Sequence, residues 1–395
     1  MFSFKQSIHS SELKYVEDEF EYFTRVESGK RIENKNSVKI SNCENILSEN
    51  DIRLNIDKNN LIYLQKTLRN IRNYLQKQNI KFSSFMKLHN EKVIIDEEKE
   101  DMRSYGLIRI VLEDEKRNIY WDDISIVNNN LIDLAQEINS CVKNNSEIIK
   151  SKKSKQSFLK LDSVPVVFSP RATGYLIHEI MGHTLEGDFY SFYKEKYNDL
   201  KISEKLMVCD CVENEKFSSS INKFDDVGTK IKPLILVENQ KICNIMATKP
   251  EDSFDGILYG FARRESYKKE AMPRMRCTYI VPNENMGLKE ISSSYDNAIL
   301  MDKAYLGGVD INTGNYFVEG TGFTLRKGKK ENVICDLKIT GNIAKNLYSF
   351  EHIGNDFKLF GSYCMKMGHY VRVGCGGPTV SLNNVSVEGR AYEAK

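Results

Sequence analysis

The sequence lacks three features, and each absence excludes a class of protein. Its 57 Lys and Arg residues face 55 Asp and Glu residues, so the net charge is only +2. A chain without a basic excess supplies no strong field for holding a phosphate backbone, and we do not expect nucleic acid as a partner. No apolar run approaches the roughly 20 residues of a membrane helix, and the N-terminal stretch has no apolar signal core. We therefore expect a soluble, cytoplasmic protein without a membrane partner.

Cysteine pairing is the third missing feature. The nine cysteines include no C-x-x-C pair, and the closest spacing is that of Cys209 and Cys211. An odd number of scattered cysteines does not suggest a disulfide framework. We expect most of them to be small buried residues in a reducing compartment.

The length of 395 residues predicts two domains, because a single hydrophobic core usually stops growing below this size. Residues 1–155 are expected to form a mixed domain, with strand-like segments beginning at Phe20 and Tyr105. Two apolar stripes at helical spacing predict two helices that face a core. Their members are Leu61, Leu64, Leu68, Ile71 and Leu75, and then Leu131, Leu134, Ala135, Ile138 and Val142.

A polar run at residues 146–157 predicts a solvated boundary between the domains. From Leu159 onward the chain contains one short strand, one helix and then many strands separated by glycine-rich turns. The predicted fold class is α+β: an N-terminal mixed α/β domain, followed at residues 156–395 by a β-rich, mainly antiparallel domain that carries a metal-binding helix.

The most informative stretch is HEIMGHTLEGD, residues 178–188. It differs from the zinc-protease signature H-E-x-x-H because three residues separate Glu179 from the second histidine. On a regular helix, residues five apart are about 140° apart around the axis, so His178 and His183 could not share a metal ion. A one-residue π-bulge or a local unwinding would restore a common face, and Gly182 permits such a distortion.

Two imidazoles on one face could bind zinc, and Glu179 could then take the proton from a zinc-bound water. The alternative is that all three residues are ordinary polar positions on a helix. A catalytic zinc needs a third protein ligand. Cys364 and His369 are the best local candidates, and His9, His89 and His352 are the remaining histidines.

These residues resemble a known family, the TldD/PmbA zinc metallopeptidases, on the TldD-like side that keeps the metal ligands. The similarity to the motif H-E-x-x-x-H-x-x-E-G-D continues through several further segments in the same order. They are R-R-E-S at Arg263, Arg264, Glu265 and Ser266, the segment with Pro273, Arg274, Met275, Thr278 and Tyr279, the stretches GGVD at residues 307–310 and GNDF at residues 354–357, and the ending with Gly374, Gly376, Pro378 and Thr379.

The resemblance implies a zinc ion held by His178, His183 and Cys364, with Glu179 as the general base. It also implies hydrolysis of unfolded or extended peptides, including precursor peptides, in a narrow enclosed site. An extended substrate would add to a sheet through main-chain hydrogen bonds. The implied assembly is a homodimer, or a heterodimer with a related subunit that lacks the metal motif.

Several roles stay open in the sequence. The first 155 residues resemble the family only in general layout. Glu186 and Asp188 could orient a metal-bound imidazole or could serve as loop and capping residues. Arg274 could bind a substrate carboxylate, whereas an internal ion-pair network is expected for Arg263, Arg264 and Glu265. We interpret His369 as a surface histidine and Cys375 as a small buried residue.

The sequence thus predicts a cytoplasmic zinc-dependent peptidase. The first alternative is a catalytically silent subunit that binds peptide or stabilises a partner. The complete set of four site residues favours the enzyme over this alternative. The second is a zinc-stabilised structural protein, which requires a closed site with His369 as the fourth ligand.

Overall fold

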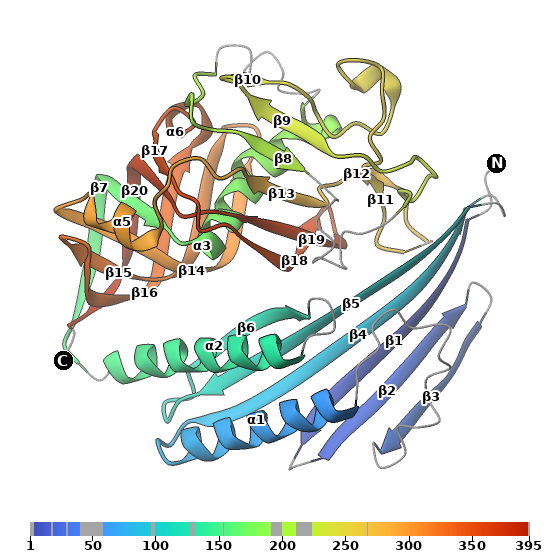
Figure 1. The fold of residues 1–395 in the computed structure, drawn as a ribbon, viewed down its shortest axis with the longest axis horizontal. Coiled ribbons are helices and arrows are strands. Elements are labelled where there is room, and N and C mark those ends of the chain that lie inside the picture. Colours follow the sequence, from blue (N-terminus) through green and yellow to red (C-terminus); the bar gives the residue numbers. More distant parts are fainter. Residues whose placement is uncertain are drawn as a thin grey trace.

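The structure is a computed structural model, and Figure 1 shows a helix-covered sheet from the N-terminal residues beside a β-rich body from the rest of the chain. The backbone is described for residues 4–16, 19–28, 31–39, 58–95, 99–126, 131–152, 154–190, 200–210, 223–266 and 268–393. Within the first 133 residues, side chains are described for residues 62–86 and 106–125.

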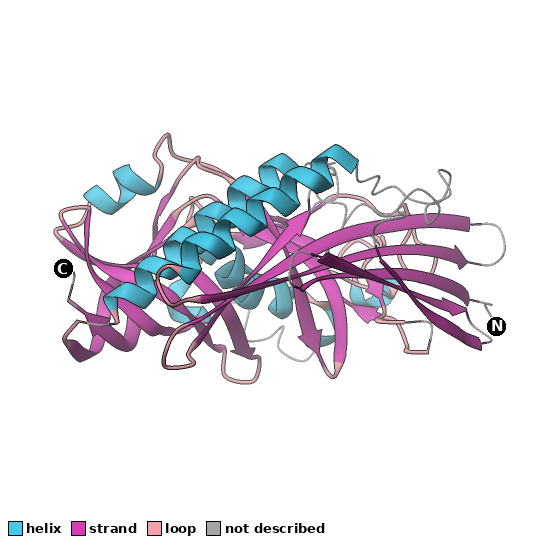
Figure 2. Ribbon diagram, turned by 90° about the horizontal axis from the view of Figure 1, so that it is seen from below, coloured by secondary structure: helices cyan, strands magenta, loops and turns pink. Residues whose placement is uncertain are grey.

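The N-terminal part contains one antiparallel sheet with two helices packed on one face (Figures 1 and 2). In the described residues the sheet has six strands in the order β3-β2-β1-β4-β5-β6. The strands are β1 (Phe4–Val16), β2 (Glu19–Ser28), β3 (Arg31–Lys39), β4 (Lys81–Ile95), β5 (Lys99–Glu113) and β6 (Ile119–Ile126). The helices are α1 (Lys58–Gln76) and α2 (Leu131–Ser151).

The two predicted apolar stripes form the core between these helices and the sheet. The stripe residues with described side chains are all buried: Leu64, Leu68, Ile71, Leu75, Leu134, Ala135, Ile138 and Val142. Leu61 and Leu131 lie outside the residues whose side chains are described. The helical spacing therefore predicted both helices and the faces that they bury.

The polar run at residues 146–157 is not a solvated linker, and this part of the prediction was wrong. Helix α2 continues to Ser151, and Ile148 and Ile149 are buried. Strand β7 (Gln156–Phe168) begins five residues after the end of this helix. Because lysines dominate the run, its composition did not indicate that the two isoleucines continue the apolar face of α2.

Among the described residues, the C-terminal part contains two six-stranded sheets and one two-stranded sheet. The first has the order β16-β15-β14-β7-β20-β17 in the described residues, and β16 also pairs with β20, so that the sheet closes on itself. Its strands are β7, β14 (Asn297–Asp310), β15 (Asn315–Arg326), β16 (Lys329–Asn342), β17 (Phe350–Ile353) and β20 (Val380–Tyr392). The end of β7 pairs with both β14 and β20. This is why the run Val166–Phe168 is fully buried and reads as continuously apolar.

The second sheet has the order β10-β9-β8-β13-β19-β18 in the described residues. Its strands are β8 (Val208–Asp210), β9 (Leu234–Glu238), β10 (Lys241–Ile242), β13 (Cys277–Ile280), β18 (Lys358–Lys366) and β19 (His369–Gly377). Strands β11 (Ala262–Arg263) and β12 (Met272–Pro273) pair with each other. Short helical segments in the loops include Pro250–Asp252, α5 (Leu288–Ser293) and α6 (Ile343–Asn346).

Helix α3 (Pro170–Ile177) contacts both of these sheets and is largely buried. Its Gly174 approaches the backbone of Gly376 on β19, where a Cβ atom would lie only 3.0 Å from the Gly376 nitrogen. The fold is α+β with mainly antiparallel sheets, as the sequence predicts. Among the described helices, none is both long and apolar enough to cross a membrane.

Candidate metal centre

The helix that carries the HEIMGH motif changes its winding inside the motif. Ser169 caps the start of α3, its side chain accepting from the backbone N–H of Ala172, and α3 ends at Ile177. Residues His178–Gly182 then form a π-helical turn, in which the N–H of His183 donates to the carbonyl of His178, five residues earlier. The imidazole rings of His178 and His183 lie 4.9 Å apart. The distortion predicted from the spacing is thus confirmed, and it brings both histidines together.

Gly182 is required at this turn by a close neighbour. A Cβ atom at this position would overlap the sulfur of Met275, which is fully buried. Glycine at this position therefore allows the chain segment after β12 to pack closely against the π-helical turn. Close approach, and not a backbone conformation reserved for glycine, is what requires the residue, because the φ of Gly182 is −59°.

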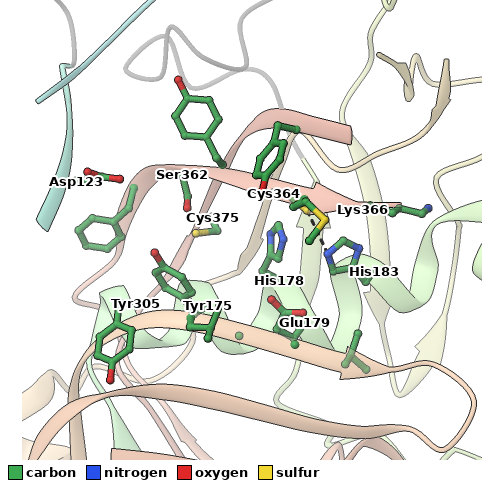
Figure 3. A pocket seen from close by; sticks show the side chains of 18 of the residues that line it. Asp123, Tyr175, His178, Glu179, His183, Tyr305, Ser362, Cys364, Lys366 and Cys375 are labelled. Atoms are coloured by element: carbon green, nitrogen blue, oxygen red, sulfur yellow. Dashed lines mark hydrogen bonds between the residues drawn. The ribbon is translucent and has the colours of Figure 1, made fainter. Parts of the chain in front are cut away.

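Cys364 on β18 completes a cluster of three possible metal ligands. The ligand atoms of His178, His183 and Cys364 lie within 4.8 Å of one another, and all three residues are buried. The sulfur of Cys364 lies 3.2 Å from Nε2 of His183. Figure 3 shows the three side chains pointing toward one another. The structure therefore brings together the residues that the motif and the resemblance singled out.

The electrostatics of the cluster favour a thiolate. Burial alone would raise the pKa of Cys364, but the charge of His178 and hydrogen bonds with both histidines outweigh it and lower this pKa to about 5. Burial would lower the pKa of His183, yet the neighbouring Glu186 and Cys364 raise it well above its ordinary value. The two shifts both favour a charged pair, with the proton on His183 and the negative charge on the Cys364 sulfur.

Glu186 holds His183 in place. It is fully buried, and its Oε2 accepts from Nδ1 of His183 at 2.9 Å and lies 2.9 Å from Nζ of Lys366. Its Oε1 accepts from the backbone N–H of Met275 at 3.2 Å. Burial opposes the charge, but His183, Lys366 and Arg274 lower the pKa of Glu186 to about 2. Of the two roles left open for this residue, orientation of an imidazole is the one that the contacts support.

Glu179 is buried directly beside the cluster. Its carboxylate lies against Gly307 of β14, where a Cβ atom would come within 2.7 Å of Oε1. The glycine of the GGVD stretch therefore leaves room for this acid. Burial raises the pKa of Glu179, while the two histidines act in the opposite direction. A carboxyl group with a raised pKa beside possible metal ligands is typical of a general acid or base.

A cavity of about 1080 Å³ opens onto these residues. It lies between two strands whose edges are not fully paired. Beyond Met301, β14 pairs only with β15 in the described part of the chain, and β18 is there the outermost strand of its sheet. Arg109, Trp121 and Asp123 of the N-terminal sheet line the same cavity.

A comparison with known protein families decides where the chain belongs. Residues 162–389 match the model of the PmbA/TldA metallopeptidase C-terminal domain, which is more than half of the chain. The chain belongs to the TldD/PmbA family. The resemblance seen in the motifs is thereby confirmed.

Relatives within the TldD/PmbA family carry metalloprotease names. A metalloprotease TldD homolog of Buchnera aphidicola is 30% identical over 239 residues, which cover 57% of this chain and 48% of the relative. A zinc metalloprotease TldD homolog of Saccharolobus solfataricus is 26% identical over 243 residues, which cover 60% and 54%. The chain thus spans about half the length of the relatives that it matches in sequence.

A solved TldD/PmbA-type structure shares the fold. The crystal structure of TldE from Thermococcus kodakarensis superposes with a TM-score of 0.65 over 98% of this chain and 96% of that chain, at 14% identity. The likeness includes the N-terminal part, which resembled the family only in layout.

The arginines of the TldD/PmbA-like motifs have structural contacts. Arg274 is fully buried and donates to the carbonyl groups of Cys364 at 2.9 Å and His369 at 3.1 Å. It therefore fastens the β18–β19 hairpin and is not placed to bind a substrate carboxylate. Arg263 donates to the carbonyl of Met275 at 2.5 Å, and Arg264 donates to the carbonyl of Asp226 at 3.0 Å. The contact of Arg263 braces Met275, the residue that packs against Gly182.

The remaining candidates lie outside the ligand cluster. His369 is not a member of the group of convergent ligands in the described residues, which does not support a closed four-ligand site. Asp188 accepts from Nζ of Lys366 at 2.7 Å. Cys375 is buried, as expected, and burial raises its pKa to about 12.

Sequence reasoning missed the residues that join the cavity to the N-terminal sheet. Arg109 makes two hydrogen bonds of 2.6 Å to Asp123 and lies over the Trp121 ring. Lys366 was also missed, although it sits two residues beyond Cys364 on the same strand. The period-2 alternation of β18 was the signal that could have placed Cys364 and Lys366 on one buried face.

Proposed function

We propose that the protein is a zinc-dependent peptidase that hydrolyses unfolded or extended peptides. The observation that carries this proposal is the convergence of two imidazoles and a thiolate beside a buried carboxylate, at the base of a cavity bounded by two strand edges. The metalloprotease names of relatives in the same family support the same activity.

The donor set fits zinc. Two imidazoles and one thiolate suit zinc and not magnesium or calcium, which prefer oxygen ligands. Nδ1 of His178 is buried without a hydrogen-bond partner among the described residues, as expected of a side chain in a metal site. Glu186 occupies Nδ1 of His183 and leaves Nε2 directed at Cys364. When bound, zinc would supply Lewis acidity, polarising a peptide carbonyl and lowering the pKa of a water molecule.

Glu179 is proposed as the proton carrier. Its raised pKa brings it closer to the operating pH, which suits a group that accepts a proton and later releases it. As general base it would take the proton of the attacking water at a carboxylate oxygen. As general acid it would then give this proton to the nitrogen of the leaving amine. Gly307 keeps the carboxylate free of a neighbouring side chain on β14.

An extended peptide is the substrate form that the cavity favours. A strand that pairs with β14 or β18 would be held by main-chain hydrogen bonds, which depend little on sequence. A folded domain offers few such free segments, because its strand edges are paired or protected. Precursor peptides and unfolded chains both meet this requirement.

We further propose a two-domain chain divided near residue 155, acting in the cytoplasm as a homodimer or with a related subunit. Separate hydrophobic clusters before and after this position support the division. Sedimentation of the purified protein would measure the assembly.

The test compares the wild-type protein with Glu179→Gln. We expect about one zinc ion per chain in both by elemental analysis, and cleavage of an unfolded protein such as reduced casein by the wild type only. A loss of about 10²-fold or more is expected for Glu179→Gln, since a general base contributes that much. Wild-type cleavage by the variant would exclude Glu179 as the base, and a wild type that neither binds zinc nor cleaves would favour a silent binding subunit.

A further inference from the structure

Six exposed, large apolar side chains line the cavity that contains the candidate metal centre. They are Trp121, Leu306, Tyr363, Met365, Met367 and Tyr370. Exposed apolar side chains gathered in one concave region mark a binding surface, whereas single ones do not. The most exposed is Met367, at 73%.

Four of these residues belong to the β18–β19 hairpin, and we name them the methionine rim: Tyr363, Met365, Met367 and Tyr370. The first three alternate along the chain with Cys364 and Lys366, which are buried. Tyr370 pairs directly with Met365 across the hairpin. The strand therefore presents the proposed zinc ligand on one face and a row of large apolar side chains on the other.

A peptide strand added at the outer edge of β18 would lie beside the rim. In the described part of the chain β18 pairs only with β19, and no described strand pairs with its other edge. Side chains of an added strand would lie about 5 Å from their cross-strand neighbours on β18. Every second side chain of such a peptide would then meet Tyr363 and Met365, while its backbone runs past Cys364.

The chemistry of the rim determines which kind of peptide side chain it can bind. Methionine side chains are flexible and polarisable, and they adapt to apolar groups of different shapes. Two cations that line the cavity are already engaged in ion pairs, Arg109 with Asp123 and Lys366 with Glu186. An apolar side chain entering the rim would therefore replace water without disturbing an ion pair.

We propose that the methionine rim is a specificity subsite that binds large apolar side chains, such as Leu, Met or Phe, at alternate positions of an extended peptide. This inference rests on the proposed function for the identity of the ligand as substrate. It goes beyond that function because main-chain pairing alone would accept every sequence equally.

The test measures binding in the Glu179→Gln background, so it does not depend on turnover. Two fluorescein-labelled peptides of about ten residues would be used, identical except for Leu or Ser at two alternate positions. We expect the Leu peptide to bind about tenfold more tightly, a ratio of the size that an apolar pocket achieves. Met365→Ser with Met367→Ser should reduce the ratio to near one. Tyr348→Ser, an equally exposed apolar position away from the cavity, should leave the ratio unchanged.

Two outcomes would overturn the inference. The first is an unchanged Leu preference in the double variant. The second is equal binding of the Leu and Ser peptides by the Glu179→Gln protein, because the rim would then exert no selection. If the sedimentation of the double variant changes while its Leu preference does not, the rim is an interface with a second copy of the chain. A Leu preference that depends on the rim, in a protein whose wild type cleaves neither peptide, would support the subsite while contradicting the proposed hydrolysis.

Discussion

In the described part of the chain, two buried charged clusters reach the same cavity, one through its metal-ligand candidates and the other through Arg171, and they differ in whether their chemistry suits a metal. The ligand cluster contains His178, His183, Cys364, Glu186 and Lys366. The junction cluster contains Asp122 of β6, Asn145 of α2, Arg171 of α3 and Lys303 of β14. Burial of charge is therefore not what distinguishes a metal centre in this fold.

The difference lies in which atoms remain for a ligand. In the junction cluster both carboxylate oxygens of Asp122 face cations, Arg171 at 3.3 Å and Lys303 at 2.7 Å. In the ligand cluster Glu186 occupies only one of the two nitrogens of His183, Nδ1, and the other nitrogen, Nε2, converges with the sulfur of Cys364. A closed ion-pair cluster fixes structure, whereas a cluster with convergent nitrogen and sulfur donors can take up a cation.

The two clusters nevertheless share their supporting elements. Arg171 lies on the helix that leads into the HEIMGH motif, and Lys303 lies four residues before Gly307 on β14. Lys303 also donates to the carbonyl of Trp121, and Arg171 donates to the carbonyl of Asp123. The junction cluster thus fastens the N-terminal wall of the cavity to the elements that position Glu179.

Breaking the junction cluster should have the largest effect on stability and none on metal binding. Asp122→Asn leaves two buried cations without their carboxylate, so we expect the free energy of unfolding to fall by about 3 kcal/mol. Urea titration would measure this loss, and elemental analysis should still find wild-type zinc. The control is Asp336→Asn, which removes an exposed partner of Arg390 and should change stability by less than about 0.5 kcal/mol. Loss of zinc at unchanged stability would contradict this prediction, because the junction cluster would then contribute to metal binding and not to stability.

Changing Glu186 breaks the ligand cluster without removing a ligand, and it should lower metal affinity as well as stability, because Lys366 and Arg274 then face a neutral group. Glu186→Gln keeps the shape of the side chain but loses the charge that orients His183, so we expect zinc affinity to fall about 10- to 100-fold. Competition with a chelator would measure the affinity. The chain offers a matched control in Glu284→Gln, since Glu284 accepts from Nδ1 of His352 at 2.8 Å far along the sequence from the motif. Equal zinc affinities in the two variants would argue against a positioning role for Glu186.

Much of the ligand cluster could be predicted because two of its residues, His178 and His183, lie close together in the sequence. The five-residue spacing of His178 and His183 indicated that a shared metal would need a π-bulge or a local unwinding, and the structure has the π-helical turn. The apolar stripes predicted α1 and α2 in the same way. Cys364 was reachable as a candidate, but its place in the cluster depended on the family resemblance and on a strand 181 residues from His183.

The junction cluster and the methionine rim could not be predicted because both depend on contacts between distant segments. Nothing near Asp122 in the sequence indicates that it contacts Arg171 or Lys303. A single acid that is buried in the fold cannot be told from an exposed one by its sequence. Arg274 illustrates the same limit: its charge suggested a substrate carboxylate, whereas its partners are carbonyl groups 90 and 95 residues away. Alternation along β18 indicates two faces but not which of them borders the cavity.

The ligand cluster contains Cys364, and the junction cluster adjoins Cys141. The pKa values of these two cysteines should be shifted in opposite directions from the ordinary value of a thiol. The imidazoles lower the pKa of Cys364 from 9.0 to about 5, whereas burial raises the pKa of Cys141, beside the junction cluster, to about 12. In the metal-free protein, the Cys364 thiolate should therefore stabilise the fold above pH 9, with this contribution decreasing as the pH falls from about 9 to about 5. Ultraviolet absorbance should detect one thiolate at pH 7, lost in Cys364→Ser and kept in Cys141→Ser. If the wild type has no thiolate signal at pH 7, the two clusters do not differ electrostatically in this way.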